Sequence, residues 1–547
     1  MNIPKIIAGL LLFCCYACGT SFSQRETPTS VIDSARIRQH IETLASDEFQ
    51  GRKPFTEGEE KTVRYLEDEL SGMGLEPGNH GSFFQEVPLV EINAVSDSVM
   101  SVHQGPKVHK LRYRQDFVAL TRRVTNQINV KQSELVFCGF GIVAPEYDWN
   151  DYEGIDMKGK TAVVLVNDPG FGTADSTLFK GNTMTYYGRW TYKYEEAARQ
   201  GAEGVLIVHD TAPAGYPWGV VQSSWSGKAL YLQTDDDNRS RCAFEGWISQ
   251  GAARQLFERA EVKNYLGKAR DASFRPTPLN MTVDLLLAVE SHKSTSRNVI
   301  ALQPGSDRSD EYVVYSAHWD HIGVGAPIEG DSIYNGALDN ASGTAVLLEI
   351  AHTFSQLEEI PARSVAFLFV TAEEQGLLGS EYYAQHPIYP LKKTVANINM
   401  DGIQFRGKMK DLTVVGYGQS ELDEYARRAA ETQKRYIKPD PNAEKGYFFR
   451  SDHFSFAKVG VPALYASGEY EQADKGVAWT KAQSDAWIQE NYHQPSDEFL
   501  PEEWKFGGMV QDAELLFNIG YTLSNESGFP RWKEGSEFKA TREAYLK

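Results

Sequence analysis

The stretch Tyr312-Val-Val-Tyr-Ser-Ala-His318-Trp-Asp320-His321 opens the part of the chain that decides the fold. Its residues up to Ala317 are apolar or small, which predicts a buried strand, and polar side chains follow directly. Residues 364–370 and 395–400 repeat this arrangement. Residues 342–354, between the first two runs, carry apolar residues at helical spacing. The pattern predicts an α/β fold in which helices flank a central sheet.

Acidic residues and histidines gather at the C-terminal ends of these predicted strands. Ligands of open α/β sheets bind outside the carboxyl ends of the strands. Carboxylates can bridge two divalent ions, and neutral imidazole is an ordinary zinc ligand. Asp339 falls in the loop that enters the helix at 342–354, where the positive end of the helix dipole tolerates a carboxylate. The residues that fit a two-metal hydrolase are His318, Asp339, Glu373, Glu374, Asp401 and His493.

The chain resembles the zinc-dependent exopeptidases of the bacterial aminopeptidase and glutamate carboxypeptidase group. The stretches that carry the resemblance are His318-Trp-Asp320-His321, Gly336-Ala-Leu-Asp339-Asn-Ala-Ser-Gly343, Thr371-Ala-Glu373-Glu374-Gln-Gly-Leu-Leu-Gly-Ser380, Asn399-Met-Asp401 and Tyr492-His493-Gln-Pro-Ser-Asp497. The resemblance implies a mixed central β-sheet flanked by helices, and two bound Zn²⁺ ions as cofactors.

The resemblance also assigns roles at this site. Asp339 would bridge the two ions, with His318 and Asp401 completing one and Glu374 and His493 the other. Glu373 would be the general base, and the Asp320 carboxylate would orient the His318 imidazole. The peptide bond after Asp339 is expected to be cis. His321 and His453 flank motifs, and we interpret them as hydrogen-bonded polar residues or partners of ligands.

The region before His453 departs from the family pattern. Relatives place a tyrosine shortly before a Ser-Asp-His stretch, where it can hold the oxyanion of the tetrahedral intermediate. Here Phe448 stands three residues before the serine and Tyr447 one further back. Tyr447 is therefore one substrate-binding candidate, and Arg450 competes with it for contact with the oxyanion or a substrate carboxylate. The alternative for Arg450 is a structural ion pair with a nearby acid.

The 547 residues exceed one compact core, so more than one domain is expected. Three stretches within residues 115–290 resemble a protease-associated domain, beginning at Gly139, Asp151 and Ala197. We therefore predict a β-rich insertion at 115–290 in a catalytic domain made of residues 28–114 and 291–547. The inserted domain could restrict which substrates enter, or serve only as a scaffold.

Three helices outside the central motifs have recognisable boundaries. Asp33 can cap the helix that carries Ile37 and Ile41. Thr56 and Glu59 have the spacing of a capping box that opens a second helix. Near the C-terminus, the apolar pattern of residues 503–523 predicts a further helix.

The N-terminal segment predicts export from the cytoplasm. Lys5 precedes an apolar run that is too short to span a bilayer, and Ala17-Cys18-Gly19 follows. This resembles a bacterial lipoprotein site, so residues 1–18 are the expected signal peptide and Cys18 the expected lipidated residue. The protein would then be anchored by lipid to a bacterial membrane, facing the periplasm or the cell surface. The alternative is an ordinary secretory peptide cleaved nearby.

The composition limits the kinds of partner that the protein is expected to bind. The chain has 55 basic and 74 acidic residues, a net charge of −19, which argues against nucleic acid and against adhesion to an anionic membrane through a basic patch. Beyond the predicted processing site the cysteines are Cys138 and Cys242, which excludes a scaffold built on disulfides and leaves one bridge open. Peptides are the expected substrates, and the sequence does not determine the oligomeric state.

Three functions compete. The first is an aminopeptidase that hydrolyses the N-terminal peptide bond through a water held between the two ions. The second is a carboxypeptidase or dipeptidase on the same scaffold, in which Arg450 binds a substrate carboxylate. The third is a non-catalytic binding protein, since the transferrin receptor resembles this group without the site. The complete ligand set and Glu373 argue against the third, and also against a one-metal glutaminyl cyclase, so we expect a metallo-aminopeptidase.

Overall fold

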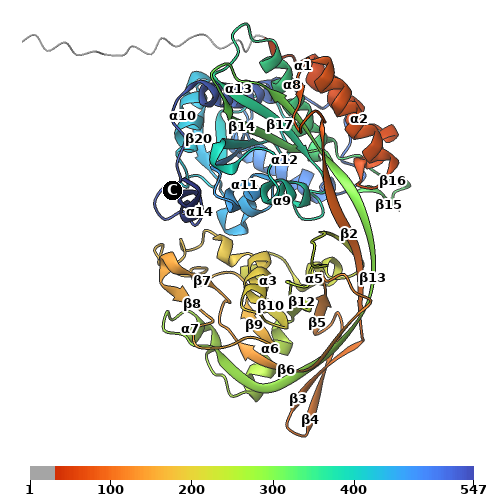
Figure 1. Cartoon of the computed structure of the whole chain (residues 1–547), viewed down its shortest axis with the longest axis vertical. Coiled ribbons are helices and arrows are strands. Elements are labelled where there is room, and N and C mark those ends of the chain that lie inside the picture. Colours follow the sequence, from red (N-terminus) through yellow and green to blue (C-terminus); the bar gives the residue numbers. More distant parts are fainter. Residues whose placement is uncertain (1–30, 547) are drawn as a thin grey trace, which may run out of the picture.

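The computed structural model describes residues 31–546 and shows two lobes joined by a long two-stranded ribbon (Figure 1). The ribbon pairs β2 (Phe84–Ser96) with β13 (Thr277–Gln303) in antiparallel register. The predicted signal peptide and the predicted lipidation site Cys18 lie outside the described residues. Within residues 31–546, no helix is both long and apolar enough to cross a membrane.

The first lobe is built on a mixed β-sheet, as the sequence predicted. Its central strands β17, β14, β18 and β21 run parallel, while β13 and β19 run antiparallel to their neighbours β17 and β21. The strands, in the order in which they pair from β13, are β17 (Arg363–Val370), β14 (Arg308–His318), β18 (Thr394–Asn399), β21 (Ala463–Ser467), β19 (Asp411–Val415) and β20 (Tyr436–Pro439), with β1 (Glu76–Pro77) beside β13.

Helices cover both faces of this sheet. Successive side chains of a strand point to opposite faces, so Val313 and Tyr315 of β14 pack into one apolar cluster and Val314 into the other. All residues of β17 are buried, which explains its uninterrupted apolar run. One face is covered by α1 (Ser34–Leu44), α2 (Glu57–Gly72), α8 (Gly343–Ser355), α10 (Leu422–Thr432) and α13 (Gly507–Asn525); the other by α9 (Leu378–Gln385) and α11 (His453–Lys458). The remaining elements of this lobe are α12 (Gly476–Glu490), α14 (Lys539–Leu546) and the hairpin β15 (Gly323–Ile328) and β16 (Asp331–Tyr334).

The predicted helix boundaries hold in part. The Asp33 carboxylate caps α1 by accepting the N–H of Ala35 at 2.8 Å, as expected. The predicted capping box at α2 is wrong: the Thr56 hydroxyl donates to the carbonyl oxygen of Lys53, and Glu59 accepts the N–H of Phe55. Helix α13 begins at Gly507 rather than at residue 503, because the residues before it form turns.

The second lobe contains a smaller sheet of mostly parallel strands. β6, β9, β10 and β12 run parallel in that order, with β5 antiparallel at β12 and β13 antiparallel at β6. The elements are β3 (Val99–Gln104), β4 (Lys107–Arg112), β5 (Phe117–Leu120), β6 (Gln127–Phe137), β7 (Val143–Ala144), β8 (Trp149–Asn150), β9 (Lys160–Leu165), α3 (Trp190–Arg199), β10 (Gly204–Val208), α4 (Thr211–Ala214), α5 (Trp218–Ser224), β11 (Lys228–Leu232), β12 (Phe244–Ile248), α6 (Gln250–Arg259) and α7 (Tyr265–Ala269). The hairpin of β3 and β4 lies at the far end of this lobe (Figure 1). It precedes residue 115, the predicted start of the insertion.

Two sequence stretches that resemble a protease-associated domain meet in this lobe. The Asp151 carboxylate accepts the backbone N–H groups of Phe140 and Ile142, both at 3.0 Å, and the indole N–H of Trp149 at 2.9 Å. One buried aspartate therefore fixes the turn that follows β6. Cys138 and Cys242 are both buried and free, so they do not form a disulfide.

Candidate metal centre

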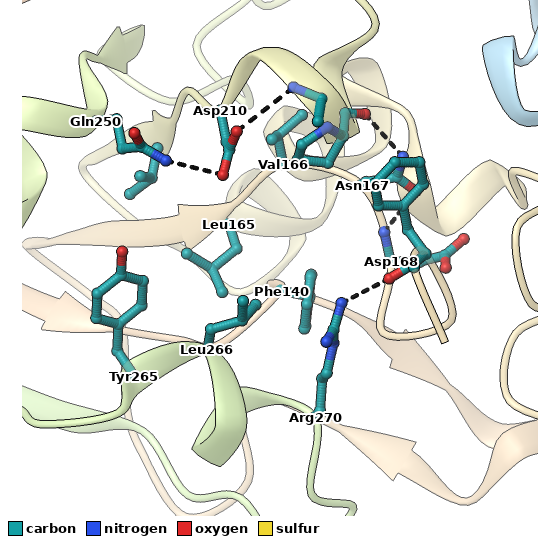
Figure 2. Close-up of a pocket in the computed structure, with 15 residues that line it drawn as sticks. Phe140, Leu165, Val166, Asn167, Asp168, Asp210, Gln250, Tyr265, Leu266 and Arg270 are labelled. Atoms are coloured by element: carbon teal, nitrogen blue, oxygen red, sulfur yellow. Dashed lines mark hydrogen bonds between the residues drawn. The ribbon is translucent and has the colours of Figure 1, made fainter. Parts of the chain in front are cut away.

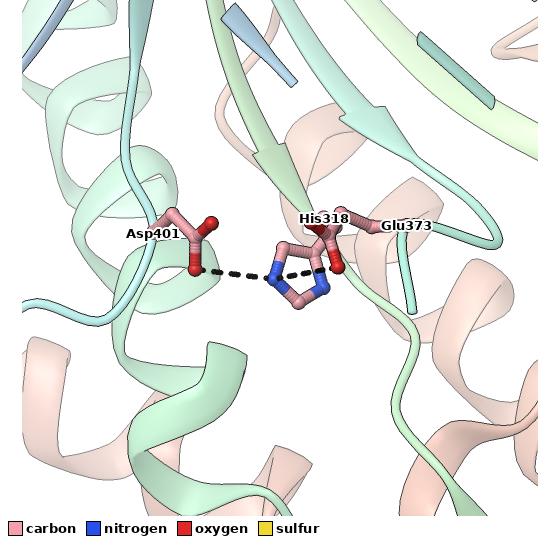
Figure 3. A group of neighbouring side chains, drawn as sticks. All are labelled: His318, Glu373 and Asp401. Atoms are coloured by element: carbon pink, nitrogen blue, oxygen red, sulfur yellow. Dashed lines mark hydrogen bonds and ion pairs between the residues drawn. The ribbon is translucent and has the colours of Figure 1, made fainter. Parts of the chain in front are cut away.

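Three parallel strands bring several of the predicted site residues to one edge of the sheet. His318 is the last residue of β14, while Glu373 follows β17 and Asp401 follows β18. β14 lies between β17 and β18, with His318 opposite Val370 and Ser316 opposite Asn399. Figure 3 shows the result: the imidazole of His318 lies between the carboxylates of Glu373 and Asp401.

The first predicted ligand triad has the spacing that one ion requires. The Nε2 atom of His318 lies 3.3 Å from Oδ1 of Asp401 and 3.3 Å from Oδ1 of Asp339. Ligand atoms about 2.0–2.1 Å from a tetrahedral zinc are separated by roughly 3.3–3.4 Å. Both carboxylates therefore lie at the distance from the imidazole nitrogen that two ligands of a common ion would have.

The second predicted triad has similar spacing. The Nε2 atom of His493 lies 3.0 Å from Oε2 of Glu374 and 3.4 Å from Oδ2 of Asp339. Asp339 thus presents Oδ1 to His318 and Oδ2 to His493, which is the geometry of a bridging carboxylate.

Two groupings that differ from the predicted triads bring three donor atoms within 4.8 Å of one another: His318 with Glu373 and Asp401, and His321 with Asp339 and Glu374. They fit an ion less well. Oε2 of Glu373 is 3.9 Å from Nε2 of His318, wider than a tetrahedral edge. Nδ1 of His321 is only 2.6 Å from Oε1 of Glu374, which is a hydrogen-bond distance. His321 thus holds one oxygen of Glu374 and leaves the other facing His493.

Glu373 is the carboxylate left over from the two triads. Its backbone N–H donates to Oδ1 of Asp320 at 3.0 Å, which fixes the turn after β17. Burial raises the pKa of the Glu373 carboxyl well above its usual range, and the nearby Asp401 adds to the increase while His318 opposes it. Its neighbour Glu374 has a lowered pKa, because His321 and His493 outweigh the effects of burial and of Asp339. Adjacent glutamates thus occupy different electrostatic environments.

The structure places Asp320 differently from the prediction. Its carboxylate lies 3.8 Å from Nδ1 of His318, beyond hydrogen-bond distance, and the ring nitrogen instead contacts the backbone carbonyl oxygen of Asp320 at 3.2 Å. The carboxylate turns toward the N–H of Glu373, so it positions the turn at Glu373 rather than the imidazole. Burial raises the pKa of Asp320 to about 8.

The loop around Asp339 is held by residues to which the sequence analysis gave no role. The Asp497 carboxylate accepts the N–H groups of Leu338 at 2.9 Å and Asp339 at 3.1 Å. The Asp339–Asn340 peptide bond is cis, as expected. Gly343 has no room for a side chain, because an added Cβ would lie 2.2 Å from Oδ1 of Asn340. Asp497 is the last residue of the sequence motif that begins with Tyr492 and His493. Its place in that motif is the sequence feature that could have indicated its role.

Arg52 is a second structural residue; it ends a stretch, residues 44–52, that resembles a family motif, but the sequence assigned it no role. Its guanidinium is buried and donates to the backbone carbonyls of Leu44, Trp319, Asn335 and Gly336. It therefore ties the segment after α1 to two loops of the centre.

Tyr465 and Tyr492 lie beside the centre: the Tyr492 ring stacks on His493, and Tyr465 contacts the segment at Asp401. The Tyr465 hydroxyl donates to the backbone carbonyl of Asp401 at 2.9 Å, and burial together with the charge of Asp401 raises its pKa well above 10. Tyr465 lies in β21, which pairs with β18 just before Asp401. Tyr447 instead lies beneath the Arg450 guanidinium, 5.2 Å from ring centre to Cζ.

Arg450 and His453, the other two residues considered in this region of the sequence, have different surroundings. Arg450 is exposed and donates to the backbone carbonyl of Lys445 at 2.9 Å, and among residues 31–546 it forms no ion pair with an acid. His453 is fully buried against Phe448 and Tyr465, and burial lowers its pKa to about 3. His453 is therefore a neutral core residue in this structure.

The donor set fits two divalent ions. Two histidines and three carboxylates converge, and Asp339 is shared between the two triads. Nε2 of His493 is buried and, within the described part of the chain, makes no hydrogen bond of good geometry, although a carboxylate oxygen lies 3.0 Å away. A buried ring nitrogen that faces carboxylates of two acidic residues has the surroundings of a metal ligand.

Comparison with known proteins finds a match over the region that carries this site. Residues 298–517 match the family model described as Peptidase family M28, and they include both triads and Glu373. The match bears out the predicted family resemblance.

Curated relatives cover parts of the chain. Aminopeptidase YwaD from Bacillus subtilis is 34% identical over 33% of this chain and 38% of its own length. The probable lipoprotein aminopeptidase LpqL from Mycobacterium tuberculosis is 28% identical over 40% of this chain and 43% of its own. The probable leucine aminopeptidase of Arthroderma otae is 32% identical over 31% of this chain and 46% of its own. The chain thus spans less than half the length of these relatives.

A solved aminopeptidase from Aneurinibacillus sp. strain AM-1 aligns with 92% of this chain and 96% of its own, at 20% identity and a TM-score of 0.49.

Proposed function

We propose that this chain, a member of peptidase family M28 through residues 298–517, is a zinc-dependent aminopeptidase that hydrolyses the N-terminal peptide bond of peptides. One observation carries the proposal: the two carboxylate oxygens of Asp339 face different histidines, His318 and His493, while Glu373 belongs to neither triad. A two-metal hydrolase needs a bridging carboxylate and a separate base. The three relatives are named as aminopeptidases, and this supports cleavage at the N-terminal end of the substrate.

His318, Asp339 and Asp401 would hold one ion, and Asp339, Glu374 and His493 the other. Two such ions supply a water of lowered pKa and polarise a carbonyl group. Glu373 accepts the proton of the attacking water on its carboxylate and later donates it to the leaving amine nitrogen. The hydrogen bond from its N–H to Asp320 fixes the backbone from which this side chain extends.

Tyr465 is proposed as a further contributor. Its ring lies close enough to Asp339, Asp401 and Glu373 for their charges to affect its pKa. A phenol in this position can donate to a developing oxyanion, which was the role considered for Tyr447. Tyr465→Phe should lower kcat with little change in KM if the hydroxyl acts mainly in the transition state.

Substrate profiling on the purified, zinc-loaded protein tests the proposal. Amino-acid anilides with a free α-amino group should be hydrolysed, and their N-acetylated forms should not. Hydrolysis of C-terminal glutamyl peptides without hydrolysis of anilides would refute the aminopeptidase assignment. Hydrolysis of neither class by the fully loaded protein would refute both peptidase assignments.

A carboxypeptidase or dipeptidase is the second candidate function, and it depends on Arg450. The guanidinium is exposed and lacks an acidic partner among the described residues, so it is free to contact a substrate carboxylate. Arg450→Gln should then raise KM for substrates with a free C-terminal carboxylate and leave their C-terminal amides unaffected. Equal effects on both would remove Arg450 from substrate recognition.

We further propose that residues 1–18 are a lipoprotein signal peptide and that lipid on Cys18 anchors the exported protein to a bacterial membrane. The sequence Ala17-Cys18-Gly19 supports this, and so does the name of the lipoprotein relative. Cys18→Ser should move the protein from the membrane fraction to the soluble fraction. Unchanged fractionation, or an intact mass without lipid in the unmodified chain, would contradict it.

The second lobe is proposed to be a protease-associated domain inserted near residues 115–290. The Asp151 turn and the stretches around Gly139 and Ala197 support the resemblance. Its contacts with the first lobe include ion pairs of Lys458 with Glu195 and of Lys180 with Glu537, both at 2.7 Å. An inserted domain fixed in this way can limit the size of the substrates that enter.

A further inference from the structure

The second lobe contains a cavity of about 240 Å³ that is separate from the metal centre (Figure 2). It lies where β9, β10 and β12 end, and its lining includes Leu165, Val208 and Gln250 from or just after those strands. The carboxyl edge of parallel strands is a common place for ligands. The volume exceeds the roughly 150 Å³ that holds benzene and falls below the roughly 300 Å³ of drug-sized pockets. One small molecule would fit.

The lining of the cavity combines an apolar floor with charged groups of both signs. Phe140, Leu165 and Leu266 form part of the apolar surface. Asp210 and Arg270 lie on opposite sides of these residues in Figure 2. A ligand held here would be amphipathic and would carry a positive and a negative group.

Neither charged group has a charged partner among residues 31–546. Arg270 donates to the carbonyl oxygen of Phe171 at 2.5 Å, but its Nε atom is buried without a hydrogen-bond partner. Asp210 accepts the side-chain amide of Gln250 at 2.8 Å and the backbone N–H of Ala212 at 3.4 Å, and among the described residues no lysine or arginine lies within ion-pair distance. Both side chains are half-buried, and the buried Nε atom of Arg270 lacks a partner, so a ligand that pairs with both charges would stabilise them.

The third charged group at the cavity, Asp168, is already satisfied. Oδ1 accepts the N–H of Gly170 at 3.0 Å, and Oδ2 accepts the hydroxyl of Thr185 at 2.7 Å and its N–H at 3.2 Å. Within the described part of the chain Asp210 accepts only two bonds, one of them long, and is therefore the carboxylate with more capacity left for a ligand.

We propose that this cavity binds one free amino acid with an apolar side chain. Its α-ammonium group donates to the Asp210 carboxylate and to the amide oxygen of Gln250. Its α-carboxylate accepts from the Arg270 guanidinium, and its side chain packs against Phe140 and Leu165. The zwitterion supplies both missing counter-charges within a molecule that the volume accommodates.

The cavity is connected to the junction between the lobes. Asp168 holds Thr185, and the flanking residues contact the first lobe: Met184 N–H donates to the carbonyl of Ala443 at 3.2 Å, and Tyr186 N–H to Oε1 of Glu537 at 3.1 Å. A ligand in the cavity can therefore stabilise the junction. Since an aminopeptidase releases free amino acids, the site would sense product; this consequence rests on the proposed function, whereas the binding site does not.

Calorimetric titration of the zinc-loaded full chain with L-leucine tests the site. Ala212→Phe places a large ring at an exposed residue that lines the cavity, and Thr211→Phe places the same ring on the preceding exposed residue outside the lining. Leucine can also bind the metal centre, so its competitive inhibition constant is measured in parallel. We expect Ala212→Phe to lose one equivalent of bound leucine with an unchanged inhibition constant, and Thr211→Phe to behave as the unmodified chain.

Ligand analogues and charge variants test how the amino acid is recognised. Arg270→Gln and Asp210→Asn should each weaken the second-lobe site by roughly tenfold to a hundredfold, the usual effect of losing a hydrogen bond to a charged group. N-acetyl-leucine and leucinamide should bind this site more weakly than leucine. Equal stoichiometry for Ala212→Phe and the unmodified chain would overturn the site, and equal binding of all three ligands would overturn recognition of the zwitterion.

Discussion

Nδ1 of His321 lies 2.6 Å from Oε1 of Glu374, and this contact directs the other oxygen of Glu374 toward His493. His321 and Glu374 are fully or almost fully buried, so solvent competes little for the bond. A residue beside the ligands thus fixes the orientation of one of them. The proposed ion at Glu374 and His493 should depend on this bond.

We therefore expect His321→Ala to weaken one of the two bound ions by about tenfold to a hundredfold, the usual effect of removing a group that orients a ligand. Zinc content measured by elemental analysis after dialysis against a buffered chelator checks this. His386→Ala, at an exposed histidine, is the matched control. Full retention of both ions in His321→Ala would show that Glu374 does not need this partner.

Asp339→Ala should lose both ions, because it removes the one side chain that faces both histidines. Asp401→Ala should lose only the ion shared with His318. Elemental analysis of the two variants side by side gives the stoichiometry. If Asp339→Ala keeps two ions per chain, the bridging assignment is wrong.

Glu373→Gln should reduce turnover by about 10²–10⁴-fold or more, because the amide keeps the size of the side chain but cannot accept the proton. Its zinc content and melting temperature should barely change. Glu374→Gln should instead lose one ion, and added zinc should partly restore its activity. The opposite pattern of metal loss would mean that the roles of the two glutamates are exchanged.

His40 should make the folded chain sensitive to acid. It is 4% exposed, its Nδ1 lies 2.6 Å from the Tyr65 hydroxyl, and burial lowers its pKa to about 4. In the unfolded chain the pKa is near 6.5, so between pH 6.5 and 4 the unfolded chain binds more protons and the free energy of unfolding falls as the pH falls. The loss between pH 7 and pH 4.5 should be about 2–3 kcal/mol.

Denaturant unfolding at both pH values, compared with His40→Gln, measures this contribution. The variant lowers stability by a similar amount at each pH through lost packing, and loss of metal in acid affects both chains equally. The pH-dependent difference between them therefore isolates His40. An identical pH dependence in the two chains would contradict a neutral buried His40.

The sequence predicted the central strands well because their signal is local. Residues 365–370 are apolar without interruption, and the structure buries all of β17 on both faces. The prediction at Thr56 and Glu59 failed for an equally local reason: both side chains found other backbone partners, Lys53 and Phe55. Spacing alone cannot distinguish a capping box from the bonds that the structure shows. The backbone groups used in the two arrangements lie within a few residues of one another.

The sequence by itself determined which residue types stand at the strand ends and in which order, and therefore the α/β class and the candidate ligands His318, Asp339, Glu374, Asp401 and His493. Only the tertiary structure decided which atoms meet. Asp497 reaches Asp339 across 158 residues, and Tyr465 reaches Asp401 across 64. The Asp320 carboxylate turned from the imidazole to the N–H of Glu373. The local pattern of apolar residues predicts where a strand ends. The partner of a buried polar group depends instead on which distant donors the packed sheet brings within about 3 Å.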